Sequence, residues 1–169
     1  ETATDAWDRI RAALARVFGI AHFERIVETG TDMDTITDEC LTLLPETSDI
    51  SFAVRATRSD KSYPLTSEEI NRVIGAAIQR NRSWSVNLTN PGLTVYISII
   101  GKKALISTKK IPGPGGLPAG VSRKVVCMIS GGIDSPVAAY RIMRRGMPPV
   151  FVHFHSYPYT GKSSQERAL

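Results

Sequence analysis

Residues 111–120, IPGPGGLPAG, are the feature that most constrains how this chain can fold. Seven of these ten residues are glycine or proline. Proline lacks a backbone N–H and glycine is costly to order, so neither a helix nor a strand can run through the segment. Because the hydrophobic pattern changes after it, we interpret residues 111–122 as a linker between domains at 1–110 and 123–169. The alternative is a long surface loop.

The first 49 residues predict part of an α+β domain. Residues 4–18 carry apolar side chains at helical spacing. Residues 21–29 are typical of a strand, and residues 32–44 of a second helix with acidic residues at its start. The first strand of such a domain would precede this run.

Residues 50–110 predict a second α+β unit. Residues 51–59 alternate like a strand, and a helix over 65–80 opens with Thr66 and Glu69 at capping-box spacing. The turn sequence at 89–92 predicts a hairpin between the strands on either side of it, and residues 103–110 predict a further strand.

The pattern after the linker is that of a βαβ unit. Residues 123–130 form an apolar run typical of a strand buried on both faces. A helix is expected over 134–146, with Pro136 in its first turn and Gly146 at its end, followed by a second buried strand over 148–156. This order predicts a parallel sheet with a right-handed crossover.

Charge is divided unevenly along the 169 residues. Residues 1–49 hold eleven acidic and four basic side chains, whereas residues 50–169 hold five and seventeen, which gives the net charge of +5. The basic part is expected to meet a polyanion, the alternative being a protein with an uneven surface. We find no signal peptide and no apolar run long enough to cross a membrane. Cys40 and Cys127 lie far apart, which favours a reducing, cytoplasmic setting.

The turn from the first buried strand to the helix reads Ser130-Gly131-Gly132-Ile133-Asp134-Ser135. A helix N-terminus at the carboxyl end of a parallel strand attracts phosphate, glycines allow close approach and unusual dihedral angles, and hydroxyls add donors. Asp134 repels phosphate but could cap the helix or help hold Mg²⁺. The alternative is a tight turn capped by Asp or Ser. Neither a Walker A sequence nor a G-x-G-x-x-G fingerprint is present.

This stretch matches SGGxDS, the PP-loop of the ATP pyrophosphatases. With its flanks, MISGGIDSPVAAYRIMRRG and VHFHSYPYT, it resembles the ThiI family of tRNA 4-thiouridine synthases. In that family a ferredoxin-like part and a THUMP domain precede the PP-loop domain. Residues 52–75 and 88–120 resemble its THUMP region and linker. The resemblance therefore implies a ferredoxin-like part and THUMP over 1–110, with the THUMP core at about 50–110, and a PP-loop domain from 123.

The resemblance also implies the site residues and ligands. ATP and Mg²⁺ are the expected cofactors, with Asp134 as the catalytic residue and no resident metal. The residues that match the family's ATP-binding positions are Met128, Ile129, Ser130, Gly131, Gly132, Asp134, Ser135, His153 and Phe154. His153 and His155 share one side of a strand and could instead bind a metal, although no third ligand is evident.

The implied reaction is adenylation of uridine 8 of tRNA by ATP, followed by replacement of its 4-oxygen by persulfide sulfur. The expected partners are tRNA and a persulfide donor such as a cysteine desulfurase, with a homodimer possible, and members of the family also supply sulfur for thiazole synthesis in thiamine formation. Six basic residues are candidates for tRNA phosphates: Arg55, Arg58, Lys102, Lys103, Lys109 and Lys110.

The end of the chain suggests a truncated PP-loop domain. Ser163 and Glu166 have capping-box spacing, so a helix is expected to begin there and to stop at residue 169. Neither cysteine sits where the family keeps its sulfur-carrying cysteine, so the chain as given is expected to be inactive. Two alternatives are a THUMP module that binds tRNA without catalysis and another PP-loop enzyme, such as an amide-forming ligase.

Overall fold

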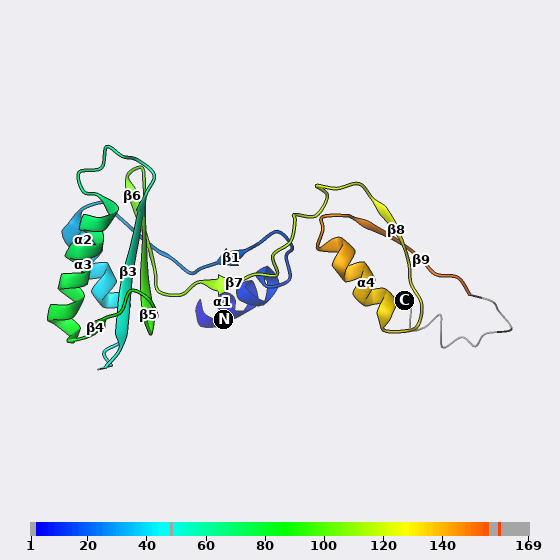
Figure 1. Ribbon diagram of the computed structural model, residues 1–169, viewed down its shortest axis with the longest axis horizontal. Helices are drawn as coiled ribbons and strands as arrows, with labels where there is room; N and C mark the ends of the chain where they lie inside the picture. The colour runs from blue at the N-terminus through cyan, green and yellow to red at the C-terminus, as the bar shows by residue number, and fades with distance from the viewer. Residues whose placement is uncertain (1–2, 48, 156–158, 160–169) are drawn as a thin grey trace. The chain divides into compact units, whose positions relative to one another are not determined.

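The computed structural model describes residues 3–47, 49–155 and 159 (Figure 1). The chain divides into two compact units. The central unit holds residues 24–110, and the composite unit combines the stretches before and after it. Residue 110 ends a unit here too, but the first 23 residues group with the later stretch, because the short strand at 22–23 pairs with residues 111–112.

The central unit is a five-stranded sheet with two helices. Its strand order is β2-β6-β5-β3-β4. β3 pairs in parallel with β4 and β5, and β6 pairs antiparallel with β5 and β2. The elements are β2 (Val27–Thr29), α2 (Met33–Leu43), β3 (Ser51–Arg58), α3 (Ser67–Arg82), β4 (Ser85–Val86), β5 (Leu93–Ile100) and β6 (Lys103–Ser107).

The expected hairpin between 85–88 and 93–100 is wrong. β4 and β5 lie on opposite sides of β3 rather than beside each other. The segment between them crosses the start of β3, where the Asn87 N–H donates to the Phe52 carbonyl and the Gly92 N–H donates to the Ser51 hydroxyl. The Asn87 side chain also accepts hydrogen bonds from the Thr89 and Asn90 N–H groups, so the turn residues build a crossover instead of a tight hairpin.

Helices α2 and α3 cover one face of the sheet (Figure 1). The capping box expected at α3 is present, with Thr66 and Glu69 satisfying each other's backbone N–H groups. The Trp84 indole N–H donates to the Thr47 carbonyl at 2.7 Å. The largest fully buried side chains of this unit are Phe52, Ile36, Ile70, Ile74, Ile78, Ile97, Ile99, Ile106 and Val95.

The composite unit contains the expected βαβ arrangement. β8 and β9 pair in parallel, with Val125 opposite Pro149 and Met128 opposite Val152, and α4 makes the crossover between them. Its elements are α1 (Ala3–Leu14), β1 (His22–Phe23), β7 (Ile111–Pro112), β8 (Val125–Met128), α4 (Asp134–Met143) and β9 (Pro149–Val152).

Three details of this unit differ from the predicted elements. α1 ends at Leu14 rather than at residue 18, and the strand expected over 21–29 is divided between β1 and β2. The two parallel strands were expected to be buried on both faces, but Val126 is 65% exposed and Phe151 is 54% exposed. The reason is that α4 packs on one face of a two-stranded sheet, within the part of the chain that the structure describes. The helix expected from Ser163 lies outside the described residues.

The Gly/Pro segment is hydrogen-bonded along much of its length rather than free. Its first two residues form β7, and the Gly113 and Gly115 N–H groups donate to the Ala21 and Ile20 carbonyls. None of the helices in the described residues is long and apolar enough to span a bilayer.

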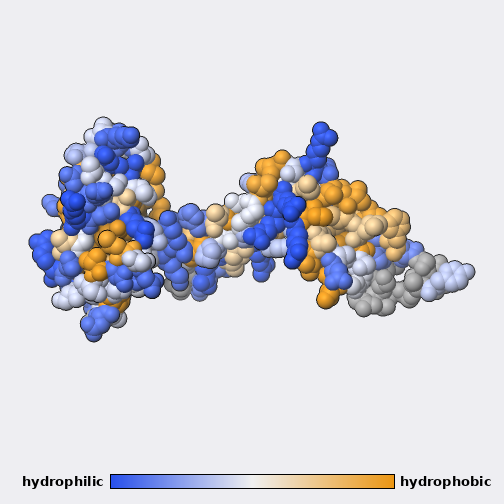
Figure 2. Space-filling view, viewed as in Figure 1, coloured by the Kyte–Doolittle hydropathy of each residue, from blue (hydrophilic) through white to orange (hydrophobic). Residues whose placement is uncertain are grey.

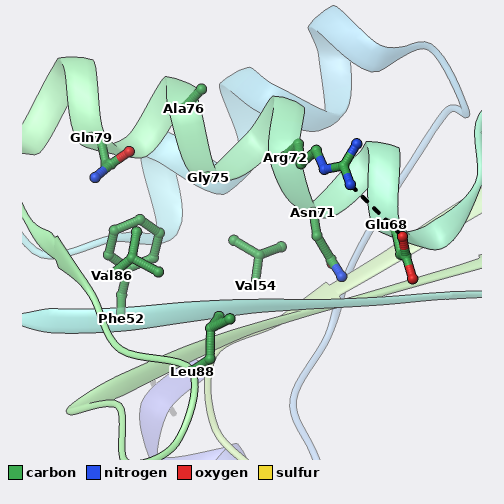
Figure 3. Close-up of a pocket in the computed structure, with 10 residues that line it drawn as sticks. All are labelled: Phe52, Val54, Glu68, Asn71, Arg72, Gly75, Ala76, Gln79, Val86 and Leu88. Carbon is green, nitrogen blue, oxygen red and sulfur yellow. Dashed lines mark ion pairs between the residues drawn. The ribbon is translucent and has the colours of Figure 1, made fainter.

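A hollow of about 440 Å³ lies between α3 and the β3–β4 edge of the sheet (Figure 3). Phe52, Val54, Val86 and Leu88 line it from the sheet side, and Gly75 faces it from the helix. A Cβ atom placed on Gly75 would meet nothing within 4 Å.

We therefore expect Gly75→Ala to stabilise the central unit by about 0.5–1 kcal/mol, because alanine has the higher helix propensity and the space is open. Urea unfolding followed by Trp84 fluorescence, in a chain with Trp7 replaced by Phe, measures this. Gly101→Ala is the matched control. Its Cβ would also meet nothing, but its φ of +58° should make alanine destabilising. A lower unfolding midpoint for Gly75→Ala would contradict the prediction.

Candidate functional site

The predicted phosphate loop lies where the sequence places it, between β8 and α4. Because β8 and β9 are parallel, the loop and the N-terminus of α4 meet at the carboxyl end of the sheet. The N-cap residue is Ile133, in an αR conformation, and no side chain caps the helix. The expectation that Asp134 could cap α4 is therefore wrong. The first backbone N–H groups of the helix have no intrahelical partner and point toward the loop.

Two serine hydroxyls hold the loop. The Ser130 N–H donates to the Ser135 hydroxyl at 2.9 Å, and the two hydroxyl oxygens lie 3.1 Å apart. The Gly132 N–H donates weakly to the Ser130 hydroxyl at 3.4 Å. These bonds close the loop on itself and bring both hydroxyls to the start of α4, beside the exposed Asp134 carboxylate.

The backbone angles at position 132 do not require a glycine. Its φ is not positive, and an added Cβ would meet only the Ser130 hydroxyl oxygen, at 3.6 Å. The expectation of unusual dihedral angles therefore does not hold at this position. A missing side chain instead leaves the exposed face of the loop open to an anion.

β9 brings His153 to the same edge. His153 Nδ1 lies 2.7 Å from the Ile129 carbonyl oxygen, which can only accept, so Nδ1 carries the proton. Nε2 is buried and makes no hydrogen bond with the described residues. Phe154 is 76% exposed and Met128 is 69% exposed.

The structure thus gathers the predicted ATP residues, from Met128 to Ser135 and His153, at one edge. The rings of His153 and His155 stack at 6.4 Å, but no group of three metal-ligating side chains occurs among the described residues.

The six basic candidates fall into three groups: two are engaged within the central unit, one is exposed in a turn, and three line two hollows. Arg58 donates to the carbonyls of Lys61 and Tyr63, and the Lys103 ammonium pairs with Glu28 at 2.6 Å. Lys102 is exposed in the turn between β5 and β6. Arg58 and Lys103 are therefore engaged inside the central unit.

Arg55, Lys109 and Lys110 lie on the sheet face opposite the helices. Arg55 and Lys110 line one hollow of about 420 Å³, and Lys109 and Lys110 line a neighbouring one of about 450 Å³. Tyr96 lines both, and the Lys110 ammonium sits 4.3 Å from the centre of its ring. Tyr96 was not among the predicted site residues. No sequence signal marks it, because its place opposite Arg55 follows from strand register, which only the fold sets.

Comparisons with known proteins identify both parts of the chain. The model of the THUMP domain matches residues 30–109, and the model described as thiamine biosynthesis protein (ThiI) matches residues 120–168. The chain belongs to the ThiI family. The predicted family is thus confirmed.

Relatives of the ThiI chain carry the name probable tRNA sulfurtransferase. The protein from Thermus thermophilus is 41% identical over 97% of this chain and 40% of its own length. The protein from Moorella thermoacetica is 36% identical over 98% of this chain and 43% of its own length. The chain thus spans about two fifths of the curated relatives it matches.

Two solved structures share the fold. PH1313 from Pyrococcus horikoshii aligns with a TM-score of 0.85 and 28% identity, over 95% of this chain and 55% of its own. A 4-thiouridine synthetase–RNA complex with bound ATP aligns with a TM-score of 0.78 and 31% identity, over 91% of this chain and 42% of its own. The expected fold class, an α+β region followed by the start of a parallel α/β domain, is confirmed.

Both cysteines are packing residues in this ThiI chain. Cys40 and Cys127 are buried. Burial, with a smaller effect of Glu39, raises the pKa of Cys40 to about 12, so its thiol stays protonated at neutral pH. Neither thiol is exposed to solvent.

Arg58 and Lys109 should respond differently to loss of charge. Arg58→Met removes two hydrogen bonds to loop carbonyls, so we expect a loss of about 1–2 kcal/mol of stability and less than about a twofold change in RNA affinity. Lys109→Met should lower RNA affinity and leave stability unchanged, because Lys109 is exposed and not ion-paired among the described residues. Urea unfolding and filter binding to tRNA measure the two effects. The reverse assignment of effects would refute this division.

Proposed function

We propose that this chain is the ATP-binding and RNA-binding part of a tRNA sulfurtransferase that makes 4-thiouridine at position 8 of tRNA. The observation that carries the proposal is the uncapped N-terminus of α4, at the carboxyl end of β8, with two serine hydroxyls and His153 beside it. Supporting it are the relatives named tRNA sulfurtransferase and the similar synthetase solved with RNA and ATP.

The residues at this edge fit ATP. The free N–H groups at the start of α4 and the helix dipole stabilise the negative charge of the phosphates. The hydroxyls of Ser130 and Ser135 can turn from each other to donate to phosphate oxygens, and Gly131 and Gly132 leave room for them. The buried His153 Nε2, which has no partner among the described residues, is available to bond a polar group of the nucleotide.

Asp134 fits an ion that arrives with ATP. No cluster of three metal-ligating side chains occurs in the described part of the chain, and Mg²⁺ held mainly by phosphate oxygens needs only one or two carboxylates. We propose that the exposed Asp134 supplies such a carboxylate. Bound Mg²⁺ would supply neutralising charge on the phosphates.

In the proposed reaction the C4 oxygen of uridine 8 attacks the α-phosphorus of ATP and pyrophosphate leaves. The outer sulfur of a persulfide then attacks C4 and AMP leaves. A second thiol attacks the carrier sulfur and breaks the S–S bond, so the base keeps the sulfur and the carrier ends as a disulfide. The sulfur comes from a persulfide donor such as a cysteine desulfurase. A homodimer, a role in thiamine synthesis and a cytoplasmic location remain predictions.

The proposed RNA surface of the central unit is the face that carries Arg55, Tyr96, Lys109 and Lys110. Two adjoining hollows share Tyr96 and Lys110, so the Lys110 ammonium, placed over the Tyr96 ring, lies between them. Glu24 lines one hollow and accepts a hydrogen bond from Ser107, so across the two hollows three cations face one carboxylate. The surplus of positive charge favours phosphate.

If this loop binds ATP, substitutions in it should lower catalysis and leave RNA binding nearly unchanged. In the intact gene product, Asp134→Ala should lower tRNA-dependent pyrophosphate release at least a hundredfold and change tRNA affinity less than about twofold, because a carboxylate for Mg²⁺ is lost. Ser135→Ala should weaken ATP binding about tenfold, since two hydrogen bonds that hold the loop disappear. Glu46→Ala, which removes an exposed carboxylate from the central unit, is the control.

Normal pyrophosphate release by Asp134→Ala would show that this loop is not the catalytic site. If the intact protein binds tRNA tightly but never releases pyrophosphate, the alternative of a non-catalytic THUMP module is favoured.

The RNA assignment predicts a steep dependence on salt. Phosphate contacts release counterions, so the logarithm of the tRNA association constant should fall with the logarithm of salt concentration, with a slope of about −2 or steeper. Lys109→Met/Lys110→Met should reduce that slope by about 2. Lys103 lies on the same sheet but is paired with Glu28, so Lys103→Met should change the salt slope by less than about 0.5. A flat response of the parent chain, or equal affinity for tRNA and heparin, would argue against RNA recognition.

A further inference from the structure

The Gly/Pro segment closes around the C-terminal end of α4. The Leu117 N–H donates to the Arg144 carbonyl at 2.9 Å, and the Gly120 and Ser122 N–H groups donate to the Gly146 carbonyl at 3.0 and 3.2 Å. The Ser122 hydroxyl donates to the Arg145 carbonyl at 3.1 Å. We call residues 115–122 the collar. It satisfies backbone carbonyls that follow α4, which a helix end otherwise leaves unpaired.

The collar depends on glycine where it approaches the helix. Gly116 has a φ of +81°, and a Cβ atom there would overlap the Arg144 carbonyl oxygen. Gly146 has a φ of +77°, and a Cβ atom there would lie 2.5 Å from a methyl group of Val121. The close approach therefore fixes the backbone that carries Arg144 and Arg145.

Five basic side chains surround the collar. Between residues 111 and 155 the chain has one acidic residue, Asp134, at the first turn of α4. All the basic residues of this stretch lie toward the other end of the helix or directly after the collar. They are Arg123, Lys124, Arg141, Arg144 and Arg145, here called the collar cations.

The collar cations lie close together and face solvent. Ser122 bonds to residues 145 and 146, and the Val125 N–H donates to the Pro148 carbonyl, so Arg123 and Lys124 run beside the segment that follows α4. All five side chains are exposed, and among the described residues none of the five forms an ion pair. In Figure 2 the hydrophilic residues of this unit gather at the end near the collar, away from the hydrophobic surface over β8 and β9.

Helix capping does not account for this cluster. Cations favour the C-terminal end of a helix, where they offset its negative dipole end. Here, however, backbone and hydroxyl donors of the collar already bond to the carbonyls of Arg144, Arg145 and Gly146. Arg123 and Lys124 lie outside the helix altogether. An unpaired cluster of five cations costs repulsion energy, which a polyanion would relieve.

We propose that the collar cations form a second RNA-binding surface, which holds the phosphodiester backbone of a paired RNA segment. The proposal rests on the proposed function, because it assumes an RNA substrate. Arginine and lysine with braced backbones suit phosphates, and phosphate contacts carry no direct sequence information. α4 is ten residues long, so this surface lies about 15 Å from the phosphate loop along the helix. RNA held here is close enough to present a neighbouring nucleotide to that loop.

The test compares two double variants of this 169-residue chain by filter binding to tRNA over a salt series. Arg144→Gln/Arg145→Gln removes two collar cations. Arg72→Gln/Arg80→Gln makes the same change of charge on α3, which covers the sheet face opposite the proposed RNA surface of the central unit. We expect the collar variant to lower affinity roughly tenfold and to reduce the salt slope by about 2, equally for tRNA and for an unrelated RNA hairpin. The α3 variant should behave like the parent chain.

A third variant tests whether the backbone contacts of the collar matter when all five collar cations are kept. Gly116→Ala keeps all five cations but forces the collar off the Arg144 carbonyl, so RNA affinity should fall while circular dichroism still reports the folded central unit. Unchanged affinity in Arg144→Gln/Arg145→Gln, or an equal loss in the α3 variant, would overturn the inference. So would a loss of binding to anionic vesicles with RNA affinity unchanged. If the parent chain itself shows no salt-dependent tRNA binding, the proposed function fails first.

Discussion

The parallel pairing of β8 with β9 is the constraint on which the candidate site depends. Two parallel strands cannot be joined by a tight turn, so the chain must cross over, and α4 makes that crossover. The crossover necessarily sets the N-terminus of α4 at the carboxyl end of β8 and returns the chain so that His153 follows β9 at the same edge. Free N–H groups, two hydroxyls and a histidine ring meet there because of the strand direction.

The two ends of α4 differ in whether their backbone polar groups have hydrogen-bond partners. At the N-terminal end no side chain caps the backbone N–H groups, and the serine hydroxyls bond mainly to each other and to the loop. At the C-terminal end the collar satisfies the carbonyls and approaches so closely that Gly116 and Gly146 are required. One end is therefore open to an anion, whereas the other is closed by backbone contacts and surrounded by cations.

Several local features could be predicted from sequence because they depend on neighbouring residues. The capping box of Thr66 and Glu69 needs only a spacing of three, and the position of the loop at 130–135 needs only a buried strand before it and a helix after it. The arrangement around β3 could not be predicted in this way. The turn at 89–92 has the composition of a hairpin, but its hydrogen bonds to Ser51 and Phe52 turn it into a crossover.

The sequence by itself determined the family, the two kinds of secondary-structure pattern and the position of the loop at 130–135, since each is carried by short-range spacing. Only the tertiary structure decided which charges are engaged. Lys103 meets Glu28 and Arg58 meets carbonyls of its own loop, whereas Lys110 is placed over Tyr96, and these pairings depend on strand register. The tertiary structure also brings residues 117 and 144 together, so that the Gly/Pro segment forms hydrogen bonds with the end of α4.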